Sequence, residues 1–446
     1  MFEPISLATL LIGALVLSAG GYAALRMRLP KSAGYGLALA ALALVFALLP
    51  TDLRQWVRGG DPGEQVLSTA RAAGIAGLLF IAGARFDGLK VWSLRRISLY
   101  TAAAGLILFT IVAVLLSTVW GQPFGLAVTA GAAVAGTSPW LTGELTRASK
   151  DETLYACVGA SAALAAIVVL TLHLITTLGG LAGRASATTY AVVISYELVK
   201  AAVIFGFGYL VTTRFLARAE DRVSRARVTG AYVIICILLF VLAATAIGQL
   251  AAFAWAFVAG AVWSRGREGE RFAAKERPAA TALLLSLALL PPLLQTHGRI
   301  ASNWAALTLL VASVLVTKFV LLGAGARTGG AAWVGATRVA AASLATLELA
   351  PAFLGLAVTR WEVGGDLYLG ILAFTGLSMI VGPLVLRLLA REGDAGETGM
   401  AVKARRSAKR RGARPSKAHS RKGGFKRIKG DERVLALAEP AGQRQA

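Results

Sequence analysis

The chain has 446 residues, of which 57% are apolar and only 15% are charged. So much apolar surface cannot be hidden in one water-soluble core, and the composition therefore excludes an ordinary soluble globular protein. The net charge of +23, from 46 Lys and Arg against 23 Asp and Glu, does not identify a substrate.

Long apolar runs with short connections extend over most of the sequence. A helix needs about 20 residues to cross a hydrocarbon layer of about 30 Å. The runs are continuously apolar rather than alternating, which favours helices over transmembrane strands. The sequence therefore predicts an all-α polytopic membrane protein with about 13 transmembrane helices. We expect them over residues 5–25, 33–50, 66–86, 97–118, 124–146, 154–175, 189–213, 228–247, 250–264, 279–296, 303–324, 335–357 and 366–390.

The first segment, 5–25, has no basic stretch before it and no small-residue cleavage site after it, so we expect it to be retained. Basic residues gather in alternate connections, after the first, third, fifth, seventh and ninth segments. The positive-inside rule then predicts an outside N-terminus and a cytoplasmic C-terminus, which requires an odd number of spans. Without a targeting segment, we expect a prokaryotic cytoplasmic (inner) membrane.

The fifth segment is interrupted by Gly-Thr-Ser-Pro at residues 136–139. Pro139 has no backbone donor, so it frees a carbonyl one turn earlier. A helix broken within the membrane is tolerated where its free polar groups are buried or line a cavity. Thr137, Ser138 and Pro139 are therefore candidates for ion binding, and a simple proline kink is the alternative.

Pro351 creates a similar interruption in the twelfth segment, beside Glu348. Two interrupted segments at matching places in the two halves are what two inverted repeats would require. A third irregular place is Pro291-Pro292, close to His297. His297 is a secondary candidate, because a lone His there is more typical of a capping or interface residue than of a ligand.

Ionisable side chains inside apolar segments are costly and are therefore candidates for function. Glu197 and Lys200 are three residues apart, close enough to pair on one helix face, so they are secondary candidates that also fit a structural ion pair. Lys318 and Glu348 have no opposite charge within four residues. Each needs a counter-charge on another helix, either for structure or along an ion route.

Residues 391–446 differ from the transmembrane domain, 1–390, because they are strongly basic and poor in apolar side chains. We expect a disordered cytoplasmic tail. It fits a solvated charge run or a polybasic segment held on anionic membrane lipid. Nucleic acid is the weaker interpretation, because Phe425 is the tail's only aromatic residue. No catalytic set, metal cluster or phosphate loop occurs in the sequence, so we expect no enzyme, metal or cofactor.

Several motifs, in chain order, resemble those of monovalent cation:proton antiporters of the sodium/proton exchanger and Kef type. Lys318 falls on that family's membrane lysine and Glu348 on the Glu of its Gly-Glu motif. The other matching stretches are RLPKSAGYGLALA from residue 28, LLFIAGARFD ending at Asp87, GTSPW at 136–140, AFAWAFVAGAVW at 252–263, LPPLLQTHGR at 290–299 and GPLVLRLLA at 382–390.

The resemblance implies a thirteen-helix antiporter with two inverted repeats, whose two broken helices cross near the middle of the membrane. A mobile core would move against a dimerisation panel. Thr137 and Ser138 would help to ligate the ion, and Lys318 would pair with an acidic group. A monovalent cation, Na⁺ or K⁺, would be exchanged for H⁺, and the protein would be a homodimer.

One departure from the family concerns the helix after the break. The family carries an acidic pair there, whereas this chain has Ala162 and Ala163, and nothing acidic lies between Glu152 and Glu197. Without a carboxylate, a site neither attracts a bare cation strongly nor couples it to a proton by competition. We therefore expect an antiporter-type transporter with altered or lost ion coupling. The alternatives are an anion transporter that uses Lys318 and a non-transporting scaffold or sensor that acts through its polybasic tail.

Overall fold

The structure is a computed structural model that describes residues 4–27, 29–48, 60–149, 152–179, 186–219, 225–264, 278–294, 304–347, 349–360, 363 and 367–389. Every regular element within these ranges is helical, which confirms the all-α fold class. Glu348, His297 and the basic tail lie outside the described residues.

The helices follow the predicted segments closely. The first half contains α1 (Pro4–Arg26), α2 (Lys31–Leu48), α4 (Gly60–Ala84), α5 (Gly88–Ser93), α6 (Arg95–Thr118), α7 (Phe124–Ala135), α8 (Pro139–Ser149), the 3₁₀ turn η1 (Glu152–Leu154) and α9 (Tyr155–Gly179). The second half contains α10 (Ala187–Ala219), α11 (Arg225–Ala246), α12 (Gln249–Trp263), α14 (Pro278–Leu294), α15 (Trp304–Thr328), α16 (Trp333–Ser343), α17 (Leu349–Arg360) and a final helix, Leu367–Leu389. Only α5 was not predicted.

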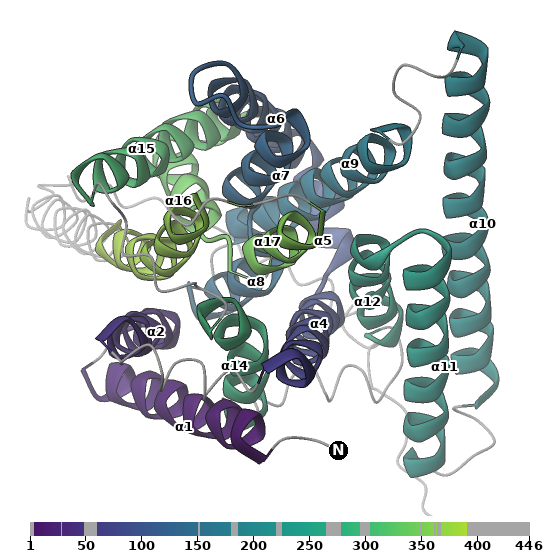
Figure 1. Cartoon of the computed structure of the whole chain (residues 1–446), viewed down its shortest axis with the longest axis horizontal. Helices are drawn as coiled ribbons and strands as arrows, with labels where there is room; N and C mark the ends of the chain where they lie inside the picture. Colours follow the sequence, from purple (N-terminus) through teal and green to yellow (C-terminus); the bar gives the residue numbers. More distant parts are fainter. Residues whose placement is uncertain are drawn as a thin grey trace, which may run out of the picture. The chain divides into compact units, whose positions relative to one another are not determined.

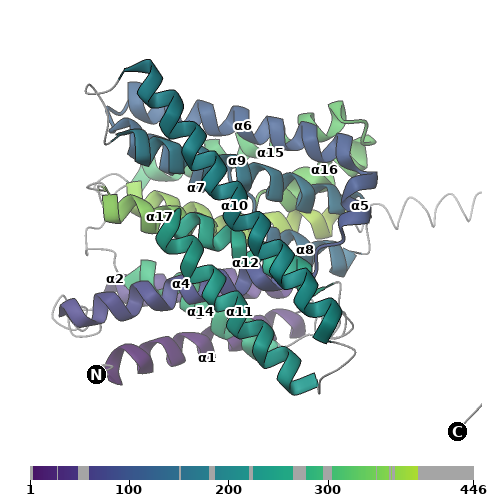
Figure 2. The same ribbon diagram turned by 90° about the vertical axis from the view of Figure 1, so that its right-hand side faces the viewer.

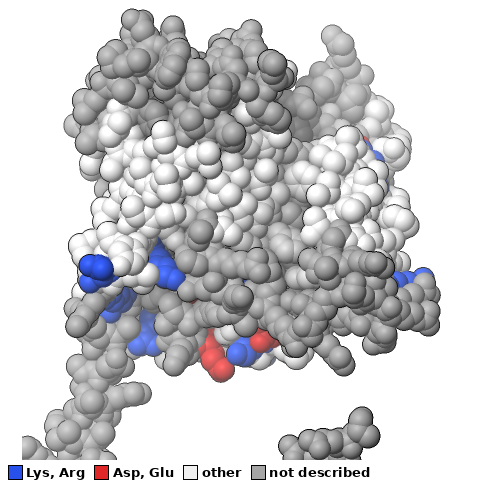
Figure 3. Space-filling view, turned by 90° about the horizontal axis from the view of Figure 1, so that it is seen from below, with Lys and Arg blue, Asp and Glu red and all other residues white. Residues whose placement is uncertain are grey.

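The helical surface is apolar enough to face lipid. Among the described residues, seven spans are long and apolar enough to cross a membrane, and four more helices are apolar but shorter. Large side chains such as Leu15 and Leu309 are 70% and 72% exposed. Figure 3 shows a broad uncharged surface with most of the visible charged side chains along one border. The chain is a multi-pass membrane protein, while the count of thirteen spans stays a prediction.

The helices form two groups by their packing (Figure 1). The peripheral group comprises α1, α2, α4, α10, α11, α12 and α14. The central group comprises α6, α7, α8, α9, α15, α16 and α17. Figure 2 shows α10 and α11 running obliquely across the other helices.

The order of a long helix, a broken helix and another long helix occurs twice. It is formed first by α6, α7 with α8, and α9, and then by α15, α16 with α17, and the final helix. This order agrees with the two repeats that the paired interruptions predict. The central group therefore places the two breaks, residues 136–138 and 344–347, where they can meet.

Glycines allow α4 and α12 to approach each other closely. A Cβ atom on Gly83 would lie 1.9 Å from the main-chain oxygen of Phe257, and one on Gly260 would lie 2.0 Å from that of Phe80. Small residues at such crossings let membrane helices pack backbone against backbone. This contact fixes α12, which forms one wall of the cavity described below.

Candidate functional site

The two broken helices cross at their breaks. The Thr137 hydroxyl donates a hydrogen bond to the Ser343 carbonyl at 3.1 Å, and the Ser138 N–H donates to the Ala345 carbonyl at 2.7 Å. These carbonyls lie at the C-terminal end of α16, where a helix leaves its acceptors without partners. Donors at the first break therefore pair with carbonyl acceptors at the second break. The predicted crossing is confirmed.

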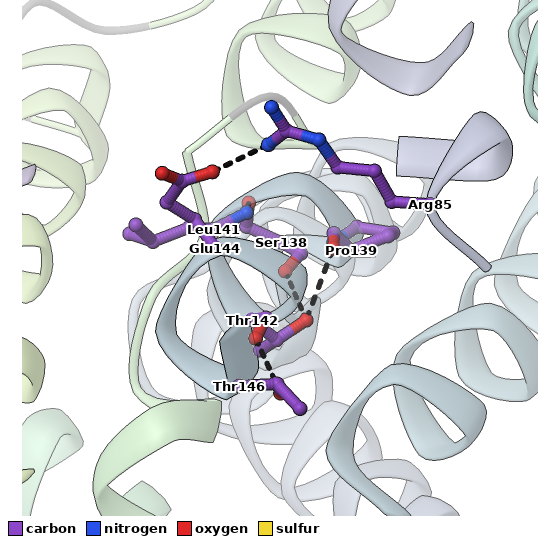
Figure 4. Close-up of polar contacts among 7 residues, drawn as sticks. All are labelled: Arg85, Ser138, Pro139, Leu141, Thr142, Glu144 and Thr146. Carbon is purple, nitrogen blue, oxygen red and sulfur yellow. Dashed lines mark hydrogen bonds and ion pairs between the residues drawn. The ribbon is translucent and has the colours of Figure 1, made fainter. Parts of the chain in front are cut away.

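Pro139 begins a helix and does not merely bend one. The backbone leaves the helical conformation at Gly136, where φ is −52° and ψ is 143°. The Ser138 Oγ then accepts a hydrogen bond from the Leu141 N–H at 2.9 Å, as an N-terminal cap does (Figure 4). Proline is favoured at the first helical position because its missing donor would be unpaired there anyway. The alternative of a simple proline kink is therefore wrong.

Lys318 of α15 lies beside the first break and is fully buried. Its Nζ donates hydrogen bonds to the Gly136 carbonyl at 2.6 Å and to the Val134 carbonyl at 3.0 Å. It also lies 5.7 Å from the centre of the Phe374 ring. The positive charge thus faces the C-terminal end of α7, which carries partial negative charge.

The resemblance implies an acidic partner for Lys318. Among the described residues, the hydrogen bonds of its ammonium group go to main-chain carbonyls at a helix end, which a broken helix leaves open to such a donor. The acidic partner stays a prediction, because Glu348 lies outside the described residues. Glu348 immediately precedes α17 in the sequence, and its assignment as a site residue stays a prediction.

A cavity of about 440 Å³ lies between the central group and helices α10 and α12. The first residues of the two half-helices, Pro139 of α8 and Leu349 of α17, form part of its wall. Ala162 lines it as well, whereas Ala163 does not. The residues lining it are apolar except for His173. The cavity thus reaches the crossing without meeting a carboxylate among the residues that the structure describes.

The pair predicted on the seventh segment is present and is joined by a histidine. The Lys200 Nζ lies 2.7 Å and 2.5 Å from the two carboxylate oxygens of Glu197 on α10. His173 of α9 contacts the same carboxylate through its Nε2, at 2.8 Å. The side chains of His173 and Glu197 are only 13% and 8% exposed. The pair therefore links α10 to the central group, as the structural interpretation expects.

A second ion pair joins the two groups at the middle of α8. Arg85, just after α4, pairs with Glu144 of α8 (Figure 4), and their side chains are 12% and 22% exposed. A hollow of about 20 Å³ lies beside this pair and is lined in part by Tyr35 and Trp140. That volume holds about one water molecule. The pair ties the end of α4 to the half-helix that begins at the break.

Two broken helices that cross beside a buried lysine, with a cavity at their N-terminal ends, define the class of secondary transporters with interrupted helices. The family model of the transmembrane domain of sodium/hydrogen exchangers matches residues 7–392. The chain belongs to this family.

The fold is similar to a solved structure of the sodium proton antiporter MjNhaP1 from Methanocaldococcus jannaschii at pH 8. The TM-score is 0.58 and the identity 13%, over 86% of this chain and 96% of that one. No curated protein matches the sequence. The family is one of transporters and not of enzymes.

Proposed function

We propose that this sodium/hydrogen exchanger-type transporter moves its solute through the 440 Å³ cavity, and that its coupling to a bare monovalent cation at Ala162 of α9 is lost or altered. The observation that carries the proposal is Ala162, which lines the cavity where the family resemblance expects an acidic side chain. A homodimer, an outside N-terminus and a location in the prokaryotic inner membrane are further parts of the proposal.

The electrostatics of the cavity support this interpretation. A cation leaving water needs oxygen ligands or negative charge, since an unpaired charge in an apolar site is strongly disfavoured. The described lining offers apolar side chains and one imidazole. The N-terminal ends of α8 and α17 also border it, and helix N-termini carry partial positive charge. The described lining thus offers no negative charge that would hold Na⁺ or K⁺ at Ala162.

The position of Lys318 does not favour the anion alternative. Its ammonium group is bonded to two carbonyls of α7 and is not among the residues that line the cavity. This arrangement supports a positioning role, in which the charge holds the break in place. The scaffold alternative, acting through residues 400–430, predicts no flux and a salt-sensitive binding that disappears when this segment is deleted.

Proteoliposomes with an imposed pH gradient test the proposal. Na⁺, K⁺ and Cl⁻ are added in turn to vesicles that contain the wild-type protein, Ala162→Asp or Ala163→Asp. We expect cation-dependent dissipation of the gradient to increase at least about tenfold in Ala162→Asp and less in Ala163→Asp, because only residue 162 lines the cavity. Rapid wild-type exchange that neither substitution changes would contradict the proposal. Loss of wild-type exchange in Glu348→Gln would assign the coupling to that carboxylate.

A further inference from the structure

The histidine at the end of the cavity offers a proton-binding group that the sequence motifs did not reveal. We propose that His173, held by Glu197, is the site at which this transporter takes up its proton, displaced along α9 from the position that Ala162 occupies. The inference rests on the proposed function and deepens it, because it names the coupling group. It combines three observations: the position of His173 in the cavity wall, its bond to Glu197, and the uncharged side chains of the other described lining residues.

His173 and Ala162 lie on the same face of one helix. They are separated by eleven residues, which is about three turns and about 16 Å along the axis. The residues of α9 that line the cavity follow the same stripe: Ala162, Ala165, Ala166, Val169, Leu170 and His173. A group at either end of this stripe therefore faces the same space.

The partner helix continues the pattern. Glu197, Ala201 and Phe205 succeed one another at intervals of four residues on α10, and the last two line the cavity. The contact between His173 and Glu197 therefore closes one end of the cavity between two facing stripes. A change of charge at this contact therefore acts electrostatically on a solute in the cavity.

The chemistry of the three side chains suits reversible protonation. An ionised carboxylate only accepts hydrogen bonds, so the His173 Nε2 carries the hydrogen shared with Glu197, and the second proton of an imidazolium is on Nδ1. With a neutral ring, Glu197 and Lys200 balance each other. Uptake of one proton then adds one positive charge to the wall of the cavity. A cation in the cavity and a proton on His173 would exclude each other through charge, without sharing a ligand.

Among the described residues, the ionisable side chains of α5, α6 and α16 that pack on α9 lie toward its opposite end, and Glu144 of α8 pairs with Arg85. Lys90 of α5 lies 4.8 Å from the ring centre of Tyr155. A Cβ on Gly159 would lie 2.8 Å from the Ser98 Oγ, which places the first turns of α6, with Arg95, Arg96 and Tyr100, about 21 Å from His173. Arg338 of α16 is next to Val339, whose carbonyl accepts from the Cys157 thiol. Helices α7 and α12 carry no ionisable side chain. Beside Lys200 lies the Tyr196 ring, 5.3 Å from its Nζ.

Histidine NMR in lipid nanodiscs tests the site without relying on flux. The chain has three histidines, so the full-length variant His297→Gln/His419→Gln leaves His173 as a single reporter. With ¹⁵N-labelled histidine, we expect both the neutral ring and the imidazolium to be observed reversibly as the pH is varied. Glu197→Gln should change this pH dependence, because the substitution removes the carboxylate that holds the ring. Glu144→Gln, in the other ion pair, should not move it. The inference is overturned if the His173 ring keeps one protonation state over the whole pH range, or if Glu197→Gln leaves its pH dependence unchanged.

The flux of the same proteins completes the test. In pH-gradient vesicles with NaCl or KCl, we expect His173→Gln to slow proton movement at least about tenfold. Glu197→Gln, which keeps the imidazole, should shift the pH profile instead. If His173 titrates but His173→Gln leaves the flux and its pH profile unchanged, the inference is wrong and the proposed function stands. If the wild type shows no flux with any ion, the proposed function fails, while the NMR titration still decides whether His173 binds a proton.

Discussion

The Nζ of Lys318 donates a 2.6 Å hydrogen bond to the main-chain oxygen of Gly136, the residue at which α7 ends. This contact links a charged side chain of α15 to the broken helix and places positive charge against the negative end of α7. Lys318 therefore completes the hydrogen bonding that the break leaves open. Its role in the fold differs from that of an ion ligand in the cavity.

Lys318→Met should strongly destabilise the protein. Methionine has a similar length but cannot donate, so the Val134 and Gly136 carbonyls would lose a charged donor in a buried site. Hydrogen bonds to charged groups contribute about 1.5–3 kcal/mol each, so we expect the free energy of unfolding to fall by about 2–4 kcal/mol. Thermal unfolding in detergent measures this loss of stability. Lys90→Met, at a side chain that is 45% exposed, is the control and should change stability little. An unchanged melting temperature in Lys318→Met would contradict this role.

Thr137→Val and Thr142→Val make the same substitution at two buried threonines with different partners. The Thr137 hydroxyl bonds to Ser343 on the other broken helix, whereas the Thr142 hydroxyl bonds to Ser138 and Pro139 within its own. Loss of the first leaves a buried carbonyl without this donor. We expect Thr137→Val to lower the free energy of unfolding by about 1–2 kcal/mol, and Thr142→Val to lower it clearly less, as measured by thermal unfolding. Equal losses for the two would show that the crossing does not depend on this bond.

A double-mutant cycle measures the ion pair between Arg85 and Glu144. Arg85→Gln, Glu144→Gln and the double variant are compared by thermal unfolding. Because both side chains are largely buried, we expect a coupling energy of about 1–2 kcal/mol, above that of exposed pairs. Additive effects would mean that the pair does not fasten α4 to α8.

Gly83→Ala and Gly206→Ala test the contact between α4 and α12. A Cβ on Gly83 would collide with the Phe257 carbonyl, while one on Gly206 would meet nothing within 4 Å. We expect Gly83→Ala to destabilise by at least about 1–3 kcal/mol through overpacking. Gly206→Ala should be neutral or stabilising, because alanine favours a helix over glycine by about 1 kcal/mol. An unchanged stability of Gly83→Ala would indicate that α4 and α12 can move apart without destabilising the protein.

The sequence predicted the helices and the break well, because both leave local signals. Continuous apolar runs located each helical segment, and Pro139 marked the start of α8. The partners of Lys318 could not be predicted, because they are main-chain carbonyls, which every residue carries and which leave no signal in the sequence. Arg85 and Glu144 are 59 residues apart, and their pairing depends on how α4 meets α8.

His173 was missed for a related reason. A lone histidine in an apolar run is usually a satisfied core residue, and its contact with Glu197 spans two helices. A usable signal was present in its spacing of three helical turns from Ala162. Short α5 was missed because its six residues, Gly88–Ser93, have no buried face.

Binding of radioactive ²²Na⁺ to purified protein in nanodiscs tests the central claim, that the described lining of the cavity at Ala162 lacks the negative charge needed to hold a cation. The wild type, Ala162→Asp and Ala163→Asp are compared at pH 8 with unlabelled Na⁺ as competitor. We predict no saturable binding at residue 162 in the wild type and saturable, competable binding in Ala162→Asp. Saturable wild-type binding that Ala162→Asp leaves unchanged would contradict the account.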